Sequence, residues 1–416
     1  MSDQQNIIIV GAGHAGGELA LAARQNGHAG PILLLGDEPG LPYQRPPLSK
    51  AYLAGDMAVE AIQLKPRANF DKAEVQLLPG RRVVAIRREQ KRVELSDGSQ
   101  LEYGRLALAT GSRPRPLPLA GVAAPERLQN FHYLRTLADV EKIRSRFVAG
   151  ARLLIVGGGY IGLEVAATAI KRGLRVTVLE AAPRVLVRVT APEVSEFYAG
   201  VHRAAGVDLR TSADIAAWSV GADGSTLTGA SLADGTQIEA DLVVAGIGVL
   251  PNTELAEAAG LAVDNGVTVD ECARTSDPDI VAAGDCTSHP SALYGRRIRL
   301  ESVPNALEQA RAAAATLCGK PKAYASVPWF WSDQYDLKLQ MVGLNQGYER
   351  CVLRGDPAAR SFAAFYMKDG VVIAADTVGR MQDFLVAKRL VAERLPVTAA
   401  QLADDALPLK SLLPAA

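Results

Sequence analysis

Short apolar runs and helix-like stretches alternate along most of the chain. The run at residues 7–10 is too short for a helix of its own, and a small-residue, Ala/Leu-rich stretch follows it after a glycine turn. A break at residues 27–31 then leads to a second apolar run, residues 32–35, with Asp37 and Glu38 close behind it. Strand, helix and strand in this order predict a βαβ unit.

The turn of this unit carries Gly11, Gly13 and Gly16. In a dinucleotide fingerprint the first glycine permits the tight turn, the second lets the backbone approach a pyrophosphate, and the third lets helix and strand pack closely. The helix N-terminus then meets the phosphate charge, and an acid at the end of the second strand accepts hydrogen bonds from a ribose. A plain glycine turn is the alternative, but it does not account for the second strand and its acid. We therefore predict a nucleotide site here.

The same pattern returns at residues 151–180. Gly157, Gly159 and Gly162 follow an apolar strand, Ile161 lies within the turn, and Glu180 ends the next strand. Chance repetition of the whole pattern is improbable, so the chain is predicted to hold two dinucleotides that are used together.

Further candidate ligand residues stand where short apolar runs end. Thr110 and Gly111 end one such run, Gly248 follows another, and Asp285 comes after a third. Ligands lie outside the carboxyl ends of the strands in open α/β sheets, so these residues are candidates for cofactor binding. For Thr110 and Gly111 a plain turn is the commoner interpretation of so short a motif.

Two segments carry clustered cations. Residues 41–55 begin as a loop stiffened by prolines and end in a short predicted helix near residues 48–53. Arg45 and Lys50 in this segment are either cofactor contacts or solvated surface charges. The basic run at residues 81–92 alternates with apolar residues and continues toward a hairpin turn at Asp97 and Gly98. We interpret this run as the solvated face of a strand rather than as a nucleic-acid patch.

Composition narrows the class of protein. The 416 residues are 48% hydrophobic, and 45 Lys and Arg balance 45 Asp and Glu. Two or three globular domains are expected, with no overall field to attract nucleic acid or an anionic membrane. The sequence begins without an apolar leader pattern and has no run long enough to span a membrane, which predicts a cytoplasmic protein. The four cysteines are far apart, without CxxC or metal-ligand spacing, which suits a reducing compartment and no metal site.

From about residue 321 the pattern changes. Strand-like runs at residues 337–342, 363–367 and 371–374 precede an amphipathic helix at residues 381–395. This part of the chain contains no glycine fingerprint. It is predicted to be a separate α+β domain.

Several segments together resemble a known family. They are VGAGHAG, LPYQRPPLSK, ATGSRPR, VGGGYIGLE, GIGVLPN, DIVAAGDC, ESVPNALEQA and WFWSDQYDLKLQMVG. The chain resembles the two-dinucleotide flavoprotein reductases of the FAD/NAD(P) pyridine nucleotide-disulfide oxidoreductase superfamily, in particular the putidaredoxin-reductase-like and dioxygenase ferredoxin reductases. The resemblance covers nearly the whole chain and implies FAD at the first fingerprint and NADH at the second.

The expected fold class is accordingly α/β, with two Rossmann-like dinucleotide-binding domains, for FAD and NADH, plus a C-terminal α+β domain. The expected bounds are 1–112 and 248–320 for the two parts of the FAD-binding domain, 113–247 for the NADH-binding domain, and 321–416 for the C-terminal domain.

The resemblance also assigns roles to individual residues. Lys50 would lie near the flavin ring, and Tyr160 and Glu164 beside the isoalloxazine, which makes these three the catalytic candidates. The other implied FAD contacts are Ala15 and Asp37 at the pyrophosphate and ribose, Val83 at the adenine, Asp285 at the ribityl chain, and Arg135 and Val303.

Cysteine usage separates this chain from the disulfide reductases of the superfamily, which carry a redox cysteine pair beside the flavin. The chain has no cysteine before Cys272, and Cys286 is solitary, so we interpret Cys286 as a packing residue. The resemblance then implies an NADH-dependent reductase in which hydride passes to FAD and single electrons pass to a [2Fe-2S] ferredoxin that serves a cytochrome P450 or an aromatic-ring dioxygenase.

Two alternatives remain open at this point. One is a reductase whose acceptor is rubredoxin, a quinone or another small oxidant, and the other is a flavin-bound regulatory protein; the oligomeric state is also open. An acidic ferredoxin would need a positive patch to dock on. The candidate cations, each of which can equally be a solvated surface charge, are Lys65, Arg67, Arg296, Arg297, Arg299, Arg311, Lys388 and Arg389.

Overall fold

The structure, a computed structural model, describes residues 5–414; the ends of the first and last predicted domains, residues 1–4 and 415–416, lie outside that range. The chain divides into two compact units. Within the described residues, the first comprises residues 5–44, 59–113 and 250–329, and the second comprises residues 45–58, 114–249 and 330–414. No helix within residues 5–414 is both long and apolar enough to cross a bilayer.

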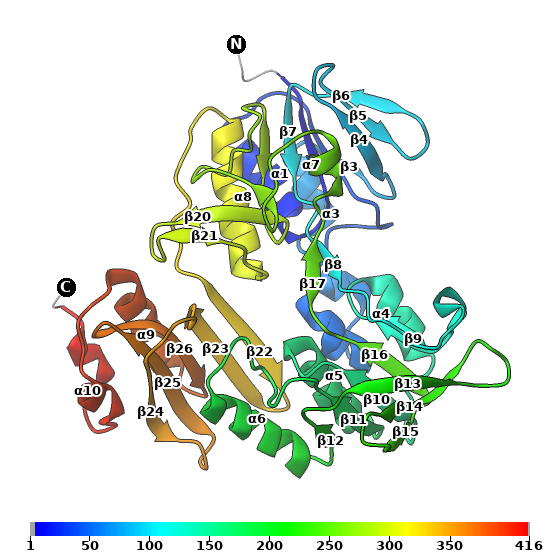
Figure 1. Cartoon of the computed structure of the whole chain (residues 1–416). Helices are drawn as coiled ribbons and strands as arrows, with labels where there is room; N and C mark the ends of the chain where they lie inside the picture. The colour runs from blue at the N-terminus through cyan, green and yellow to red at the C-terminus, as the bar shows by residue number, and fades with distance from the viewer. Residues whose placement is uncertain (1–4, 415–416) are drawn as a thin grey trace. The chain divides into compact units, whose positions relative to one another are not determined.

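The first unit is built on a five-stranded parallel sheet, whose strands are short apolar runs because both faces are covered. The strand order is β19 (Ile280–Ala282), β7 (Arg105–Leu108), β1 (Ile7–Val10), β2 (Ile32–Leu35) and β3 (Val75–Leu78). Helices α1 (His14–Gln25) and α8 (Val303–Leu317) run close together beside this sheet (Figure 1). Their small residues, among them Ala20 and Ala313, share one core with the sheet and allow this close packing.

Smaller elements complete the first unit. The short helices are α3 (Arg67–Lys72) and α7 (Glu254–Ala258), and 3₁₀ turn η2 covers Val59–Ile62. One antiparallel sheet is formed by β4 (Val83–Arg87), β5 (Arg92–Leu95) and β6 (Gln100–Glu102), and another three-stranded sheet by β18 (Val267–Thr268), β20 (Thr287–Ser291) and β21 (Arg296–Ile298). Strands β8 (Ser112–Pro114) and β17 (Val249–Pro251), where the chain passes from one unit to the other, pair as a separate two-stranded sheet.

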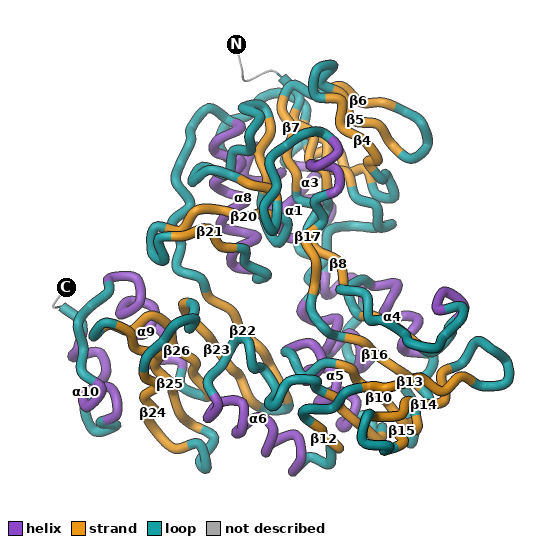
Figure 2. The backbone as a smooth tube through the Cα atoms, in the orientation of Figure 1, coloured by secondary structure: helices purple, strands orange, loops and turns teal. Residues whose placement is uncertain are grey.

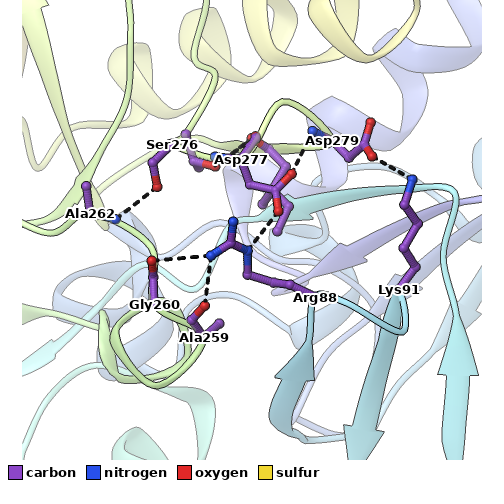
Figure 3. Close-up of polar contacts among 10 residues, drawn as sticks. Arg88, Lys91, Ala259, Gly260, Ala262, Ser276, Asp277 and Asp279 are labelled. Carbon is purple, nitrogen blue, oxygen red and sulfur yellow. Dashed lines mark hydrogen bonds and ion pairs between the residues drawn. The ribbon is translucent and has the colours of Figure 1, made fainter.

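The basic run at residues 81–92 differs from its prediction as one strand face, because the turn between β4 and β5 interrupts it. Two cations of this turn are paired with acids: Arg88 Nε donates to Asp277 at 2.8 Å, and Lys91 Nζ donates to Asp279 at 2.6 Å (Figure 3). Arg88 also donates to the carbonyl oxygens of Ala259 and Gly260. The run therefore ties the small sheet to its own unit and is not a free basic patch.

The second unit repeats the architecture of the first. Its parallel sheet has the order β12 (Asp208–Arg210), β11 (Arg175–Leu179), β10 (Arg152–Val156), β16 (Leu242–Ala245) and β9 (Phe131–Tyr133). Its helices are α2 (Ala51–Ala54), α4 (Leu137–Arg144), α5 (Tyr160–Lys171) and α6 (Pro192–Ala204). An antiparallel sheet of β13 (Ile215–Val220), β14 (Leu227–Leu232) and β15 (Gln237–Glu239) follows, as β4–β6 does in the first unit.

The second unit also contains the C-terminal α+β part, whose strands β22 to β26 and helices α9 and α10 are labelled in Figure 2. Its antiparallel sheet has the order β22 (Trp329–Gln334), β23 (Leu337–Gly343), β26 (Val371–Val378), β25 (Ser361–Lys368) and β24 (Arg350–Asp356). Helix α9 (Met381–Glu393) packs on this sheet, and α10 (Ala399–Ala403) and η4 (Leu409–Leu412) follow.

The predicted fold class is confirmed, and the differences lie in single elements. Strand β24 was not predicted, because Arg354 in its middle is 3% exposed and interrupts the apolar alternation; its guanidinium lies 3.4 Å from both Asp383 and Asp405. The short helix predicted near residues 48–53 is instead a 3₁₀ turn, η1 (Pro46–Ser49), followed by α2, since two prolines restrict the first turn.

Candidate functional site

The first glycine loop leads from β1 into α1. Gly11 has a φ of +110°, and a Cβ there would lie 2.2 Å from the carbonyl oxygen of Ala109. A Cβ at Gly16 would lie 1.8 Å from the carbonyl oxygen of Gly11. A Cβ at Gly13, in contrast, would meet no described atom within 4 Å. The outer glycines are therefore required by packing, and the middle one leaves open space over the backbone, as an approaching phosphate requires.

The second loop has the same geometry. Gly157 has a φ of +111°, and a Cβ there would lie 2.5 Å from the carbonyl oxygen of Gly246. A Cβ at Gly162 would lie 2.1 Å from the carbonyl oxygen of Gly157. Around Gly159 a Cβ would again meet no described atom within 4 Å.

Both helices that follow these loops begin without a capping side chain. Gly13 is the N-cap of α1 and Gly159 that of α5, and neither first turn contains an acid. The first backbone N–H groups and the positive end of each helix dipole are therefore available to an anion. Open backbone, uncapped N–H groups and small residues fit the pyrophosphate of one dinucleotide at each loop.

The other predicted residues of the first unit gather at the carboxyl ends of its parallel strands. Asp37 follows β2, is exposed, and has no hydrogen bond or ion pair within residues 5–414, whereas the neighbouring Glu38 accepts a hydrogen bond from Tyr43. Asp285 follows β19 and accepts a hydrogen bond from Ser112 Oγ at 2.8 Å. Asp37 is thus the free carboxylate that a ribose contact needs.

The backbone at one of these strand ends lies close to the first glycine loop. A Cβ at Gly284, next to Asp285, would lie 3.1 Å from the Cβ of Ala15 at the start of α1. Thr110, after β7, donates from Oγ1 to the carbonyl oxygen of Asn252 at 2.7 Å, which fixes the turn that includes Gly111.

Val83 and Val303 mark the beginnings of elements in the same unit. Val83 is the first residue of β4 and lies in the same buried cluster as Val10 and Leu35, the last residues of β1 and β2. Val303 is the first residue of α8, which begins at the N-cap Ser302. Val83 therefore belongs to the core that also contains the last residues of β1 and β2.

In the second unit the acid of the fingerprint is already held by the backbone. Glu180 Oε2 accepts the N–H of Gly158 at 2.7 Å, and its Oε1 accepts the N–H of Ala182 at 2.8 Å. Each carboxylate oxygen has a further lone pair, so Glu180 is fixed beside the loop and can still accept from a ribose hydroxyl.

The loop after Glu180 contains two arginines with different surroundings. Arg184 donates to the carbonyl oxygens of Val187 and Thr190 and to Ser195 Oγ, so its guanidinium braces the loop. Arg188 is exposed and lies within 3.4 Å of a Cβ built at Gly248. Arg188 was missed by sequence reasoning, because only folding brings it to the strand end that holds Gly248.

The three catalytic candidates lie in the second unit. Lys50 Nζ donates to Glu164 Oε2 at 2.6 Å and to the carbonyl oxygen of Pro46 at 3.1 Å. Tyr160 and Glu164 are one turn apart on α5, on the same face of the helix. Burial holds the pKa of Tyr160 well above its usual value, so the phenol stays protonated.

Glu164 is 3% exposed and accepts two further hydrogen bonds. Ser49 Oγ donates to Oε2 at 2.5 Å, and Ser332 Oγ donates to Oε1 at 2.7 Å. Three donors thus hold one buried carboxylate, which compensates for its removal from water. Neither serine was predicted: Ser49 is adjacent to Lys50 in the proline-rich loop, and no sequence signal connects Ser332 to the site.

The remaining predicted cofactor-binding residues of the second unit are Arg45 and Arg135, which contact each other, and Ile161. Arg45 Nη1 donates to the carbonyl oxygen of Arg135 at 2.6 Å, which brings these two predicted residues together. Ile161, beside the second glycine loop, is 42% exposed although apolar, as expected for a residue that a ligand would cover.

The cysteines give no sign of redox chemistry. All four are free thiols. Cys286 is fully buried, and burial raises the pKa of its thiol. A raised pKa disfavours the reactive thiolate, which supports the interpretation of Cys286 as a packing residue.

Four of the eight predicted docking cations form ion pairs with acidic neighbours. The pairs are Arg67 with Asp71, Arg299 with Glu301, Arg311 with Glu18, and Arg389 with Glu393. Arg297 donates to the carbonyl oxygens of Val269 and Ser288. These five cations are therefore partly neutralised or already used in hydrogen bonds within their own units.

Two uncapped glycine loops, with a Lys50–Glu164 ion pair beside the second whose carboxylate is buried, fit a two-nucleotide oxidoreductase. A family model described as pyridine nucleotide-disulphide oxidoreductase matches residues 5–310, and one described as reductase C-terminal matches residues 329–413. The chain belongs to the pyridine nucleotide-disulphide oxidoreductases. Membership of this family implies FAD and a nicotinamide dinucleotide as its cofactors.

Individual relatives cover the chain from end to end. It is 51% identical over 416 residues to putidaredoxin reductase of Pseudomonas putida, covering 100% of this chain and 98% of the relative. It is 43% identical over 410 residues to the ferredoxin–NAD(+) reductase component of the anthranilate 1,2-dioxygenase system of Burkholderia cepacia, covering 98% of each. The crystal structure of the covalent putidaredoxin reductase–putidaredoxin complex contains a chain that matches with a TM-score of 0.95 at 51% identity, over 98% of both chains.

Proposed function

We propose that the chain is an FAD-dependent NADH:ferredoxin reductase that delivers electrons to a [2Fe-2S] ferredoxin serving a cytochrome P450 or an aromatic-ring dioxygenase. The observation that carries the choice of acceptor is the likeness, over 98% of both chains, to a reductase crystallised with its putidaredoxin. The solitary, buried Cys286 supports a route that needs no protein thiol.

The chain's own residues bind and orient the reactants in this proposal. FAD, when bound, accepts a hydride from NADH and passes electrons on one at a time. Gly13 and Gly159 leave room for the two pyrophosphates, and Asp37 and Glu180 accept hydrogen bonds from the riboses. Arg188 adds a positive charge beside Gly248 at the second site.

The Lys50–Glu164 pair supplies the electrostatics of the reaction. Glu164 holds the Lys50 ammonium group in one position, and Ser49 and Ser332 hold Glu164 in turn. A fixed ammonium group favours negative charge that develops during reduction, because its orientation is set before the reaction begins. The low exposure of Glu164 keeps water from screening the pair.

A reductase of rubredoxin, a quinone or another small acceptor is the second candidate. The pairing of Arg299, Arg311 and Arg389 with neighbouring acids favours it, because paired cations attract an acidic ferredoxin less strongly.

The test is NADH-dependent reduction of cytochrome c with a panel of purified [2Fe-2S] ferredoxins, compared with rubredoxin and a water-soluble quinone. We expect at least one ferredoxin to raise turnover about tenfold or more over the reductase alone, whereas turnover with the small acceptors alone would favour the second candidate. A protein whose FAD is reduced by NADH but stays reduced with every carrier would instead be a regulatory flavoprotein.

We also propose a cytoplasmic location. The four free thiols support it, since reduced cysteines are typical of a reducing compartment.

A further inference from the structure

A line of buried hydrogen bonds leads from α6 to the Glu164 carboxylate. Tyr335 Oη lies 3.0 Å from His202 Nδ1, and His202 Nε2 lies 2.9 Å from Gln334 Oε1. Gln334 Nε2 lies 3.2 Å from Ser332 Oγ, and Ser332 Oγ lies 2.7 Å from Glu164 Oε1. His202 and Ser332 are fully buried, and Gln334 is 1% exposed. The three inner members of the line therefore depend on each other rather than on water.

The direction of every bond in this line follows from its last member. A carboxylate only accepts, so the Ser332 hydroxyl must donate its proton to Glu164. Ser332 Oγ is then left to accept from the Gln334 amide N–H, which turns the Gln334 carbonyl oxygen toward His202.

The histidine at the other end must therefore donate from Nε2. Its Nδ1 carries no proton and accepts from the Tyr335 hydroxyl. Burial lowers the pKa of His202, against the opposing effect of its bond to Gln334, so the imidazole is neutral and one tautomer satisfies both of its neighbours. A charge on α5 thus determines where the proton sits on a histidine of α6.

We propose that His202 is a positioning residue for the Glu164–Lys50 pair and acts through Gln334 and Ser332. The line keeps the Ser332 hydroxyl on Oε1 of Glu164 and leaves Oε2 to Lys50 and Ser49. An ordered polar line in a buried site fixes the carboxylate in one orientation, because every alternative leaves a buried group without a partner. The effect on NADH oxidation rests on the proposed function, whereas the order of the hydrogen bonds rests on this chain alone.

The first test observes the proton on His202 directly. ¹⁵N NMR of the histidine-labelled, FAD-loaded protein, with the signal assigned through a His202→Gln variant, should show His202 as the Nε2–H tautomer. Glu164→Gln should move the proton to Nδ1. Its amide oxygen would face Lys50 and Ser49, its NH₂ group would donate to Ser332, and each later bond in the line would then reverse.

A matched control uses the equivalent residue of the first fingerprint. Glu18→Gln makes the same chemical change one turn into α1 and should leave the His202 tautomer as it is in the wild type. His202 with its proton on Nδ1 in the wild type, doubly protonated at neutral pH, or unaltered by Glu164→Gln would overturn the proposal.

The second test measures the effect on the reaction. In stopped-flow mixing, His202→Leu should slow reduction of bound FAD at saturating NADH by about fivefold or more and leave the apparent Kd for NADH within about twofold. His202→Gln, which can still donate an N–H to Gln334, should recover most of the rate. Gln340→Leu, a substitution of another buried glutamine in the same sheet, should change the rate by less than about twofold.

The remaining outcomes are also decisive. Equal rates for wild type and His202→Leu would overturn the positioning role. A wild-type protein that NADH does not reduce would overturn the proposed function, while the tautomer measurement would still decide the order of the hydrogen bonds.

Discussion

Glu18 and Glu164 occupy the same position in the two glycine fingerprints, yet their surroundings differ. Each lies seven residues after the first glycine of its loop, one turn into the following helix. The Glu18 side chain is 19% exposed and pairs with Arg311, whose side chain is 59% exposed. Glu164 is 3% exposed and is held by Ser49, Lys50 and Ser332.

The difference shows which features of the fingerprint bind a nucleotide and which were added for chemistry. The glycines have the same geometry in both loops because pyrophosphate binding uses only backbone and space. An exposed ion pair contributes little, whereas a buried carboxylate requires dedicated donors around it. In the function we propose, the second loop therefore carries the reactive pair, and the first loop holds its cofactor by shape.

The largest expected effects come from the glycines. Gly16→Ala places a Cβ where backbone stands and should abolish soluble, FAD-loaded protein, because the loop cannot relax without moving β1 or α1. Gly13→Ala should keep the fold and weaken FAD binding by about tenfold, roughly 1.4 kcal/mol. The FAD-to-protein ratio and the melting temperature measure both effects.

The second loop provides the matched control for this prediction. Gly159→Ala should keep FAD and raise the Kd for NADH instead. Loss of FAD from Gly159→Ala, or full FAD affinity in Gly13→Ala, would break the assignment of one nucleotide to each loop.

Glu164→Gln and Glu18→Gln test the central difference between the two acids. Glu164→Gln removes the charge that holds Lys50 and should slow reduction of bound FAD by NADH at least about tenfold. Glu18→Gln removes only an exposed pair and should stay within about twofold. Stopped-flow reduction at saturating NADH measures both, and equal rates for the two variants would contradict the account.

The two acids at the strand ends, Glu180 and Asp37, should also differ in which nucleotide their substitution affects. Glu180→Ala should weaken NADH use and narrow the preference over NADPH by at least about tenfold, roughly 1.4 kcal/mol, because a carboxylate accepts from the 2′-hydroxyl and repels a 2′-phosphate. Arg184 should add little to NADPH binding, because its guanidinium already donates to Val187, Thr190 and Ser195. The ratio of kcat/KM for the two nucleotides is the measurement.

Asp37→Ala is the control in the first unit. It should weaken FAD binding and leave the NADH-to-NADPH ratio unchanged. A ratio that Glu180→Ala does not alter would mean that another residue reads the ribose.

A smaller effect concerns the loop after Glu180, which the C-terminal sheet anchors in the second unit. Tyr366 Oη accepts the N–H of Ala191 and donates to Asp376, and burial raises the pKa of Asp376 to about 7. Because the folded-state pKa lies above the unfolded one, the stabilisation is complete at acid pH, below the unfolded pKa of about 4, and is lost as the pH rises through 7. Thermal melting should therefore show wild type losing stability relative to Asp376→Asn between about pH 4 and about pH 7, with no further relative loss above that range, and parallel pH profiles would contradict this.

The sequence was sufficient for the features that depend on short-range pattern. The strands around Gly11 and Gly157, the helices after them and the strand-end acids all lie where periodicity and glycine spacing place them. Lys50 and Glu164 needed the family resemblance, since 114 residues separate them in the chain. Ser332 and Arg188 could not be predicted, because their roles arise only when the C-terminal sheet and the loop after Glu180 pack against α5 and β16.

The interruptions in the pattern have the same physical origin. Strand β24 was not predicted because a buried arginine, Arg354, breaks its apolar pattern. The charge of Arg354 is compensated by Asp383 and Asp405, which come from distant segments of the chain. The turn inside residues 81–92 was not predicted, because its cations were interpreted as part of a solvated strand face. In the structure Arg88 and Lys91 pair with Asp277 and Asp279.

The measurement that tests the central claim most directly is NADH oxidation by a variant without thiols. Cys272, Cys286, Cys318 and Cys351 are replaced by alanine, and the FAD-loaded protein is followed in anaerobic stopped flow, first with NADH and then with ferredoxin or ferricyanide. The account predicts that reduction and reoxidation both stay within about tenfold of wild type, because electrons pass from NADH through FAD to the acceptor without a protein thiol. A folded, FAD-loaded variant that NADH reduces normally but no acceptor reoxidises would contradict it.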